Sequence, residues 1–208
     1  MYRVWAVEQC WVWTGRILAG LALLFCLPLL LLLALLVKLS GPGPVLHVSL
    51  RLGQGGRSFR LYKFRSMRPG AEDELAALIA AHPERQQAWE ERGKLSADPR
   101  VTAFGRFLRR SSLDELPQFF NILKGDMHWV GPRPILAEEL CRYGEQVALL
   151  HSVKPGLTGL WQVSGRSSLS YAQRVELDLQ YIRERSPALD LKILAKTLPE
   201  VFKARGAC

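Results

Sequence analysis

The sequence is poor in the residue types that build disulfide frameworks and structural metal sites. It holds four cysteines and four histidines in 208 residues, and the cysteines lie far apart without a Cys-x-x-Cys pair, at Cys10, Cys26, Cys141 and Cys208. The histidines show no metal-ligand spacing either. A disulfide-stapled fold and a zinc site are therefore not expected, and a reducing cytoplasmic setting is favoured.

Charge is absent from one long stretch near the N-terminus. The 21 residues from Ile17 to Val37 carry no charged side chain, and as a straight helix they would cover roughly 30 Å, the hydrocarbon thickness of a bilayer. The stretch is too long for most signal-peptide cores, and no Ala-x-Ala cleavage site follows it. A single transmembrane span is the default interpretation.

Two features favour a re-entrant helix over a span. Pro28 lies near the middle of the stretch, where it removes a backbone donor and clashes with the carbonyl of Leu24, so it kinks or breaks the helix. Both flanks are positively charged, through Arg3, Arg16, Lys38 and Arg51. Because positive flanks tend to stay in the cytoplasm, we expect residues 1–40 to enter and leave through one leaflet. A kinked span is the alternative.

Acidic residues are missing from a second stretch, residues 51–68. It carries six basic side chains, Arg51, Arg57, Arg60, Lys63, Arg65 and Arg68, and a second basic group follows at Arg100, Arg106, Arg109 and Arg110. With a net charge of +9, such patches suit phosphates of a nucleotide, an anionic lipid or a nucleic acid, or form a solubilising surface. No nucleic-acid partner is expected, because interleaved aromatic residues and a helix-turn-helix pattern are lacking.

The remainder, residues 41–208, reads as one compact cytoplasmic domain behind the breaker cluster at residues 40–44. Two β-prone runs, residues 45–52 and 58–64, flank a glycine-rich turn and predict a small hairpin. Helical composition covers residues 71–94, with an interruption at His82-Pro83, and the chain closes with helices over 170–184 and 188–204. The fold class expected is α+β and mainly helical.

The segment Ser112–Gln118 offers candidate chemistry. Ser112 and Glu115 have the spacing of a capping box, which would make the segment an ordinary helix start. Pro117 argues instead for a helix that begins nearer Pro117 and leaves Asp114 and Glu115 just ahead of it. In that position Asp114 can act as a nucleophile and Glu115 can hold a divalent cation. The cations available for phosphate oxygens are Lys63, Arg109, Arg110 and Arg133.

Several longer motifs resemble those of the bacterial sugar transferases, the monotopic phosphoglycosyl transferases that prime polysaccharide and glycoconjugate assembly. They comprise residues 63–67, 98–102, 105–110, 111–118, 121–127, 130–134 and 155–166, in this order along nearly the whole chain. The resemblance implies an enzyme at the cytoplasmic face of the bacterial inner membrane. It would move a sugar phosphate from a UDP-sugar to undecaprenyl phosphate and release UMP.

The resemblance also implies roles for individual residues. Asp114 matches the aspartate that forms a covalent phosphosugar intermediate, and Glu115 matches its partner in the dyad, associated with Mg²⁺. The residues that fall in motifs implied to bind substrate are Lys63, Arg65, Arg109, Arg110, Arg133, Gln162, Arg166 and Asp178. The length of residues 67–98 and the Gly206-Ala207 ending favour a hexose 1-phosphate donor, and a homodimer is a further expectation.

Three positions depart from the family pattern. Leu27 stands where many members have a serine before the proline, and Gly15 stands where an aspartate is frequent. His128 replaces a usual serine after Gly-Asp-Met. The first two bear on the geometry of the membrane helix, and none touches the proposed dyad.

Overall fold

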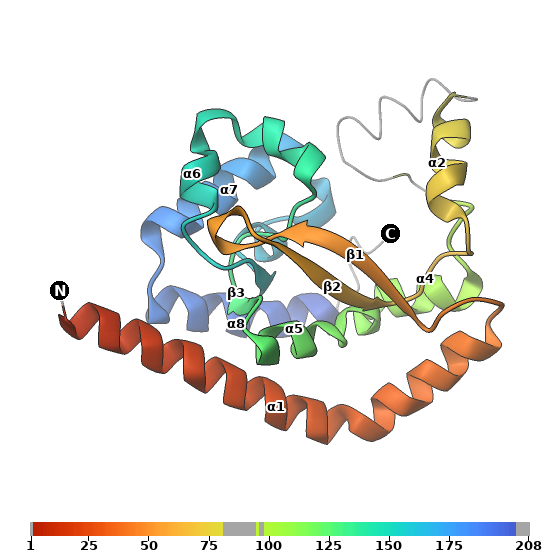
Figure 1. The fold of residues 1–208 in the computed structure, drawn as a ribbon, viewed down its shortest axis with the longest axis horizontal. Coiled ribbons are helices and arrows are strands. Elements are labelled where there is room, and N and C mark those ends of the chain that lie inside the picture. The colour runs from red at the N-terminus through yellow and green to blue at the C-terminus, as the bar shows by residue number, and fades with distance from the viewer. Residues whose placement is uncertain (1, 81–94, 96–97, 203–208) are drawn as a thin grey trace.

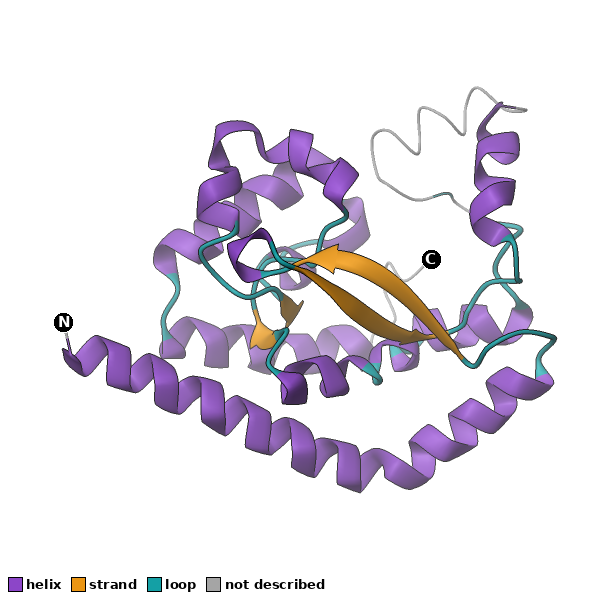
Figure 2. Cartoon of the chain, in the orientation of Figure 1, coloured by secondary structure: helices purple, strands orange, loops and turns teal. Residues whose placement is uncertain are grey.

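The computed structural model of the chain describes residues 2–80, 95 and 98–202, and its fold is α+β and mainly helical, as predicted (Figures 1 and 2). The helices are α1 (Tyr2–Leu39), α2 (Ala71–Ala80), α4 (Ala103–Arg110), α5 (Gln118–Lys124), α6 (Val147–Leu150), α7 (Tyr171–Glu184) and α8 (Pro187–Phe202). Short 3₁₀ segments are η1 (Gln54–Gly56), η2 (Leu113–Glu115), η3 (Ala137–Gln146), η4 (Trp161–Val163) and η5 (Arg166–Ser168). The strands are β1 (Leu46–Leu52), β2 (Ser58–Phe64), β3 (His128–Val130) and β4 (Gly156–Thr158). The expected interruption at His82-Pro83 and the Gly206-Ala207 ending lie outside the described residues.

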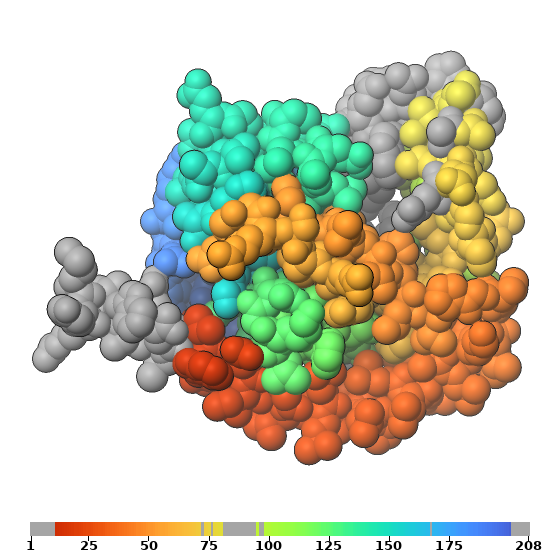
Figure 3. All heavy atoms as spheres, viewed as in Figure 1, coloured from red at the N-terminus to blue at the C-terminus, as the bar shows by residue number. Residues whose placement is uncertain are grey.

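The uncharged stretch lies within the single continuous helix α1. Pro28 does not break this helix, and the ribbon bends in its second half (Figure 1). A narrow stripe that includes Ala19, Leu33 and Val37 is buried against the domain, whereas most of the leucines on the helix are exposed. Figure 3 shows residues 11–39 of α1 along the lower edge of the molecule. The part Trp11–Leu39 is long and apolar enough to cross a membrane, which is consistent with membrane association.

Both halves of α1 are fastened to the same domain. Near the N-terminal end, the indole Nε1 of Trp11 donates a hydrogen bond to Asp190 Oδ2 of α8 at 3.0 Å. Near the other end, the guanidinium of Arg65 donates to the carbonyl oxygen of Val37 at 2.9 Å. The helix therefore lies along the domain rather than projecting from it (Figure 1).

Gly15 has a packing role in this arrangement. Its carbonyl oxygen accepts a hydrogen bond from Trp129 Nε1 at 2.8 Å. A β-carbon at Gly15 would lie 3.3 Å from Trp129 Cδ1, which is tight contact. The absence of a side chain at Gly15 thus allows α1 to approach the indole of Trp129 closely.

The predicted hairpin is present. Strands β1 and β2 pair antiparallel, from Leu46 opposite Phe64 to Leu52 opposite Ser58. The sequence did not predict a second sheet, in which β3 pairs parallel with β4. Its strands are three residues long, too short to leave a readable alternation of apolar and polar residues.

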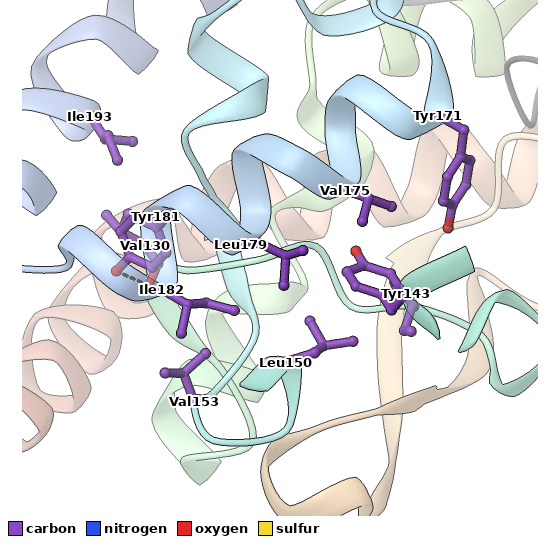
Figure 4. Packing of buried hydrophobic residues seen from close by; sticks show 11 residues of the cluster. Val130, Tyr143, Leu150, Val153, Tyr171, Val175, Leu179, Tyr181, Ile182 and Ile193 are labelled. Atoms are coloured by element: carbon purple, nitrogen blue, oxygen red, sulfur yellow. Dashed lines mark hydrogen bonds between the residues drawn. The ribbon is translucent and has the colours of Figure 1, made fainter. Parts of the chain in front are cut away.

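The largest core cluster lies between α7, α8 and the segments around β3 (Figure 4). Helix α7 begins at a capping box in which Ser170 Oγ accepts from the backbone N–H of Gln173. Helix α8 buries Ile193 completely, whereas Leu191 and Leu198 are exposed. Helix α8 therefore packs into the core on one face and leaves apolar side chains uncovered on another.

Candidate active site

The two candidate carboxylates lie on η2, a single 3₁₀ turn between α4 and α5. Ser112 precedes this turn in a left-handed conformation (φ 56°), and its side chain makes no capping hydrogen bond. The capping-box interpretation is therefore wrong. Helix α5 begins at Gln118 after Pro117, so Asp114 and Glu115 lie just ahead of it, as the alternative predicted.

Apolar side chains on either side of the dyad attach it to the membrane helix. Leu113 and Leu116 pack against a cluster that contains Leu33 and Val37 of α1 together with Leu108 of α4. Because η2 is only three residues long, these contacts determine which way its carboxylates face. The dyad is consequently tied to the second half of α1.

Lys63 is the cation in direct contact with the dyad. Its Nζ lies 2.6 Å from Glu115 Oε1, and the two side chains are 31% and 37% exposed. An ion pair this accessible adds little stability. Its importance lies in holding a positive charge beside two adjacent carboxylates.

The position of Lys63 depends on Asn121, a residue without an assigned role in the sequence analysis. Asn121 is fully buried on α5. Its Oδ1 accepts from the backbone N–H of Tyr62 at 3.1 Å, and its Nδ2 donates to the carbonyl oxygen of Arg60 at 2.6 Å. The amide thus occupies the free edge of β2 as a third strand would. Asn121 is the only asparagine in the chain and interrupts the apolar side of a short helix, a signal that could have identified it.

The two carboxyl groups differ in acidity. Burial raises the pKa of Asp114 to about 6, with Lys63 opposing the change, Glu115 adding to it and Arg109 opposing it. Burial also acts to raise the pKa of Glu115, but the charge of Lys63 and its hydrogen bond outweigh burial, so that this pKa is lowered. Asp114 is therefore the more basic carboxylate and is still mainly ionised above pH 6, as a nucleophile requires.

The remaining predicted cations differ in their relation to the dyad. Arg109, with its Nε 2.8 Å from Ser66 Oγ, acts electrostatically on Asp114, and Arg133 acts on Glu115. Arg110 is exposed at the end of α4. Arg65 is not brought to the dyad: its buried guanidinium donates to the carbonyl oxygens at the C-terminal end of α1, namely those of Val37, Gly41 and Pro42.

The last three predicted substrate residues, Gln162, Arg166 and Asp178, lie on η4 (Trp161–Val163), η5 (Arg166–Ser168) and α7 respectively. Asp178 of α7 is 1% exposed, and its Oδ2 accepts from the hydroxyl of Tyr143 at 3.0 Å. Burial raises the pKa of Asp178 to about 7, and a backbone hydrogen bond from Arg133 opposes the rise. Arg166 donates to the carbonyl oxygen of Gln162 at 3.2 Å and acts electrostatically on Glu115. Asp178 therefore lies against the turn that carries Arg133, and both residues line one small pocket.

The side chains of the dyad suit a hard cation that also binds substrate phosphates better than a metal ion coordinated by protein side chains alone. No group of three or more His, Cys, Asp or Glu side chains gathers anywhere in the described part of the chain. Mg²⁺ is typically held by one or two carboxylates together with substrate phosphates and water. Asp114 and Glu115 fit that pattern.

The site thus has the parts of a phosphate-transfer centre at a membrane: a basic carboxylate, an acidic carboxylate, several cations and a long apolar helix beneath them. The family model described as bacterial sugar transferase matches residues 11–204. The chain therefore belongs to the bacterial sugar transferase family and is a phosphoglycosyl transferase.

Several curated relatives support this membership. The exopolysaccharide production protein ExoY of Rhizobium meliloti is 44% identical over 189 residues, which is 91% of this chain and 84% of that protein. The undecaprenyl-phosphate galactose phosphotransferase of Salmonella typhimurium is 46% identical over 89% of this chain and 39% of its own length. The UDP-glucose:undecaprenyl-phosphate glucose-1-phosphate transferase of Escherichia coli is 41% identical over 92% of this chain and 40% of its own length. The chain thus spans most of ExoY and about two fifths of the other two relatives.

Proposed function

We propose that this chain transfers a hexose 1-phosphate from a UDP-sugar to undecaprenyl phosphate and releases UMP. The observation that carries the proposal is the position of Asp114: a buried, basic carboxylate beside Lys63 and Arg109, on a turn packed against α1. The relatives named above act on galactose and glucose phosphates, which supports a hexose donor. Together with ExoY, they support a role at the first membrane step of exopolysaccharide, capsule or O-antigen assembly.

In the first step, a carboxylate oxygen of Asp114 forms a bond to the β-phosphorus of the UDP-sugar. The bond between that phosphorus and the oxygen bridging the two phosphates breaks, and UMP leaves with the oxygen. Lys63 and Arg109 offset the negative charge that gathers on the phosphate oxygens. Arg133 and Arg166, which act on Glu115, are the cations proposed to bind the nucleotide phosphate and sugar.

In the second step, a phosphate oxygen of the lipid acceptor forms a bond to the same phosphorus, and the carboxylate of Asp114 is released. A covalent intermediate lets the soluble donor and the membrane-bound acceptor use one site in turn. The attachment of η2 to α1 supports this order of events, because it keeps Asp114 close to the surface where the acceptor's phosphate resides.

Glu115, with Asp114, would hold Mg²⁺, which supplies charge neutralisation for the leaving nucleotide. The contact between Lys63 and Glu115 has a role here, because the ammonium group keeps Glu115 ionised until a cation arrives. Glu115 could then exchange its contact with Lys63 for a contact with Mg²⁺.

We further propose that α1 is a re-entrant helix and that residues 41–208 lie on the cytoplasmic side. A span would carry one end of the apolar stretch roughly 30 Å from the other, across the bilayer. Contacts of Trp11 with Asp190 and of Val37 with Arg65 tie both ends to one domain, which supports a common side for them. The bend in α1 supports the same topology (Figure 1).

A labelling experiment tests the chemistry. The full chain in detergent is incubated with a UDP-hexose carrying a labelled β-phosphate and sugar, without lipid acceptor, and the labelled peptide is mapped. We expect label on Asp114, none in Asp114→Asn, and undiminished label in Asp73→Asn, which alters an exposed carboxylate on α2. Label on another residue, or full turnover by Asp114→Asn, would refute the assignment.

A further inference from the structure

Two cations converge beside the first half of α1, away from the dyad. Gly125 ends α5 with φ 88°, and a β-carbon on it would lie 3.7 Å from both Arg16 Cζ and Lys154 Nζ. Arg16 belongs to α1, and Lys154 belongs to the loop before β4. The fold therefore brings like charges from distant parts of the chain together beside one small glycine.

Neither cation forms an ion pair with a described residue. Arg16 uses its Nε to donate to the carbonyl oxygen of Leu123 at 2.8 Å, and its two terminal nitrogens have no hydrogen bond to the described residues. Lys154 forms no hydrogen bond or ion pair within the same described ranges. Burial and the charge of Arg16 lower the pKa of Lys154, with Asp126 opposing them. Holding such charges together costs free energy unless an anion compensates them.

The nearest carboxylate is already engaged. Asp126 Oδ2 lies 3.2 Å from Lys124 Nζ and accepts from Asn121 Nδ2 at 3.3 Å. It cannot neutralise Lys124, Arg16 and Lys154 together. An additional anion would offset the positive charge that remains.

The location of this site identifies the kind of anion. Arg16 is the last charged residue before the apolar stretch, and Ile17, which follows it, is 62% exposed. Trp13 is 57% exposed, and the guanidinium carbon of Arg16 lies 4.7 Å from the centre of its ring. Tryptophan and arginine beside an exposed apolar helix are typical of the headgroup region of a bilayer, the depth at which lipid phosphates lie.

We propose that Arg16 and Lys154 bind the phosphate of an anionic phospholipid headgroup where the first half of α1 meets the membrane surface. The inference rests on the membrane placement of α1 proposed above. Two cations that lie beside the same glycine suit one phosphate, which accepts a forked bond from a guanidinium and a single bond from an ammonium. The site is distinct from the dyad, which packs against Leu33 and Val37 of the other half of the helix. Bound lipid would hold this end of the domain against the membrane.

Lipid retention on the intact protein tests the inference. The full chain is purified in a neutral detergent, mixed with phosphatidylglycerol or phosphatidylcholine of the same acyl chains, and examined by native mass spectrometry. We expect preferential retention of phosphatidylglycerol by the wild type. Lys154→Gln should reduce it about fivefold, and the double variant Arg16→Gln/Lys154→Gln should reduce it further, because each cation near a surface of anionic lipid contributes about 1 kcal/mol. Lys192→Gln, which removes an exposed cation from α8, should not reduce it.

Each contrary result has a defined meaning. Equal retention of the two lipids by the wild type, or wild-type retention by Lys154→Gln, would overturn the inference. Displacement of phosphatidylglycerol by an equal concentration of inorganic phosphate would also overturn it, because the site would then recognise free phosphate. Covalent labelling of Asp114 by UDP-hexose in detergent tests the proposed function separately from lipid binding. Lys154→Gln should label like the wild type, whereas a wild type that fails to label would refute the function and leave the lipid result unaffected.

Discussion

Replacing Asn121 by alanine tests how the hairpin that carries Lys63 is held. The amide is fully buried, and its removal leaves the N–H of Tyr62 and the carbonyl of Arg60 without their partners on the free edge of β2. A buried backbone group left unpaired costs about 1–3 kcal/mol, so the loss of both bonds should lower the free energy of unfolding by about 2–6 kcal/mol. For a chain of this size that corresponds to a fall in Tm of about 4–24 °C.

Thermal unfolding of the full chain in one detergent, followed by circular dichroism, measures the effect. Asn121→Asp should lose nearly as much stability, because a carboxylate can accept from Tyr62 but cannot donate to the carbonyl of Arg60. Gln180→Ala removes an exposed amide that bonds only to exposed Glu184 and should leave Tm within about 1 °C. A Tm for Asn121→Ala equal to that of Gln180→Ala would refute the view that this amide supports β2.

Four further outcomes are expected. The kcat/KM of the enzyme should fall as pH drops through about 6, where Asp114 is protonated, and Lys63→Met should move this limb to higher pH because a cation that lowers the pKa of Asp114 is lost. Because the pKa of Asp114 is raised in the folded protein, its ionisation opposes folding above about pH 6. Asp114→Asn should therefore raise Tm at pH 8. A gain in Tm that is equally large at pH 4 would contradict this. Excess chelator should abolish transfer and added Mg²⁺ should restore it, whereas full activity in chelator would exclude the role of Glu115 in holding a metal. In a cysteine-free background, Arg3→Cys and Pro44→Cys should both resist an impermeant thiol reagent on intact cells; reaction at position 3 alone would show that α1 spans.

Much of the fold was predictable because its signals are local. The hairpin follows from two β-prone runs around a glycine-rich turn, and α7 begins at a capping box readable from Ser170 and Gln173. The strands β3 and β4 were missed because three-residue strands have no periodicity, and they exist through pairing across more than twenty residues. The continuous path of α1 through Pro28 was also open from the sequence, since a helix can absorb a proline by bending.

The sequence by itself determined the family and a long uncharged helix near the N-terminus, and it predicted the dyad of Asp114 and Glu115, because motif order and composition do not depend on packing. Only the tertiary structure decided what individual arginines and amides do. Arg65 is one of six basic residues between positions 51 and 68. Its guanidinium donates a hydrogen bond to the C-terminal end of α1, whereas Lys63, two positions earlier, contacts Glu115. The partners of Asn121 at the edge of β2, and the approach of Arg16 to Lys154, could likewise not be predicted from the sequence. The physical reason is that a side chain's partner is chosen by the packing of elements distant in sequence, and local sequence patterns do not record that choice.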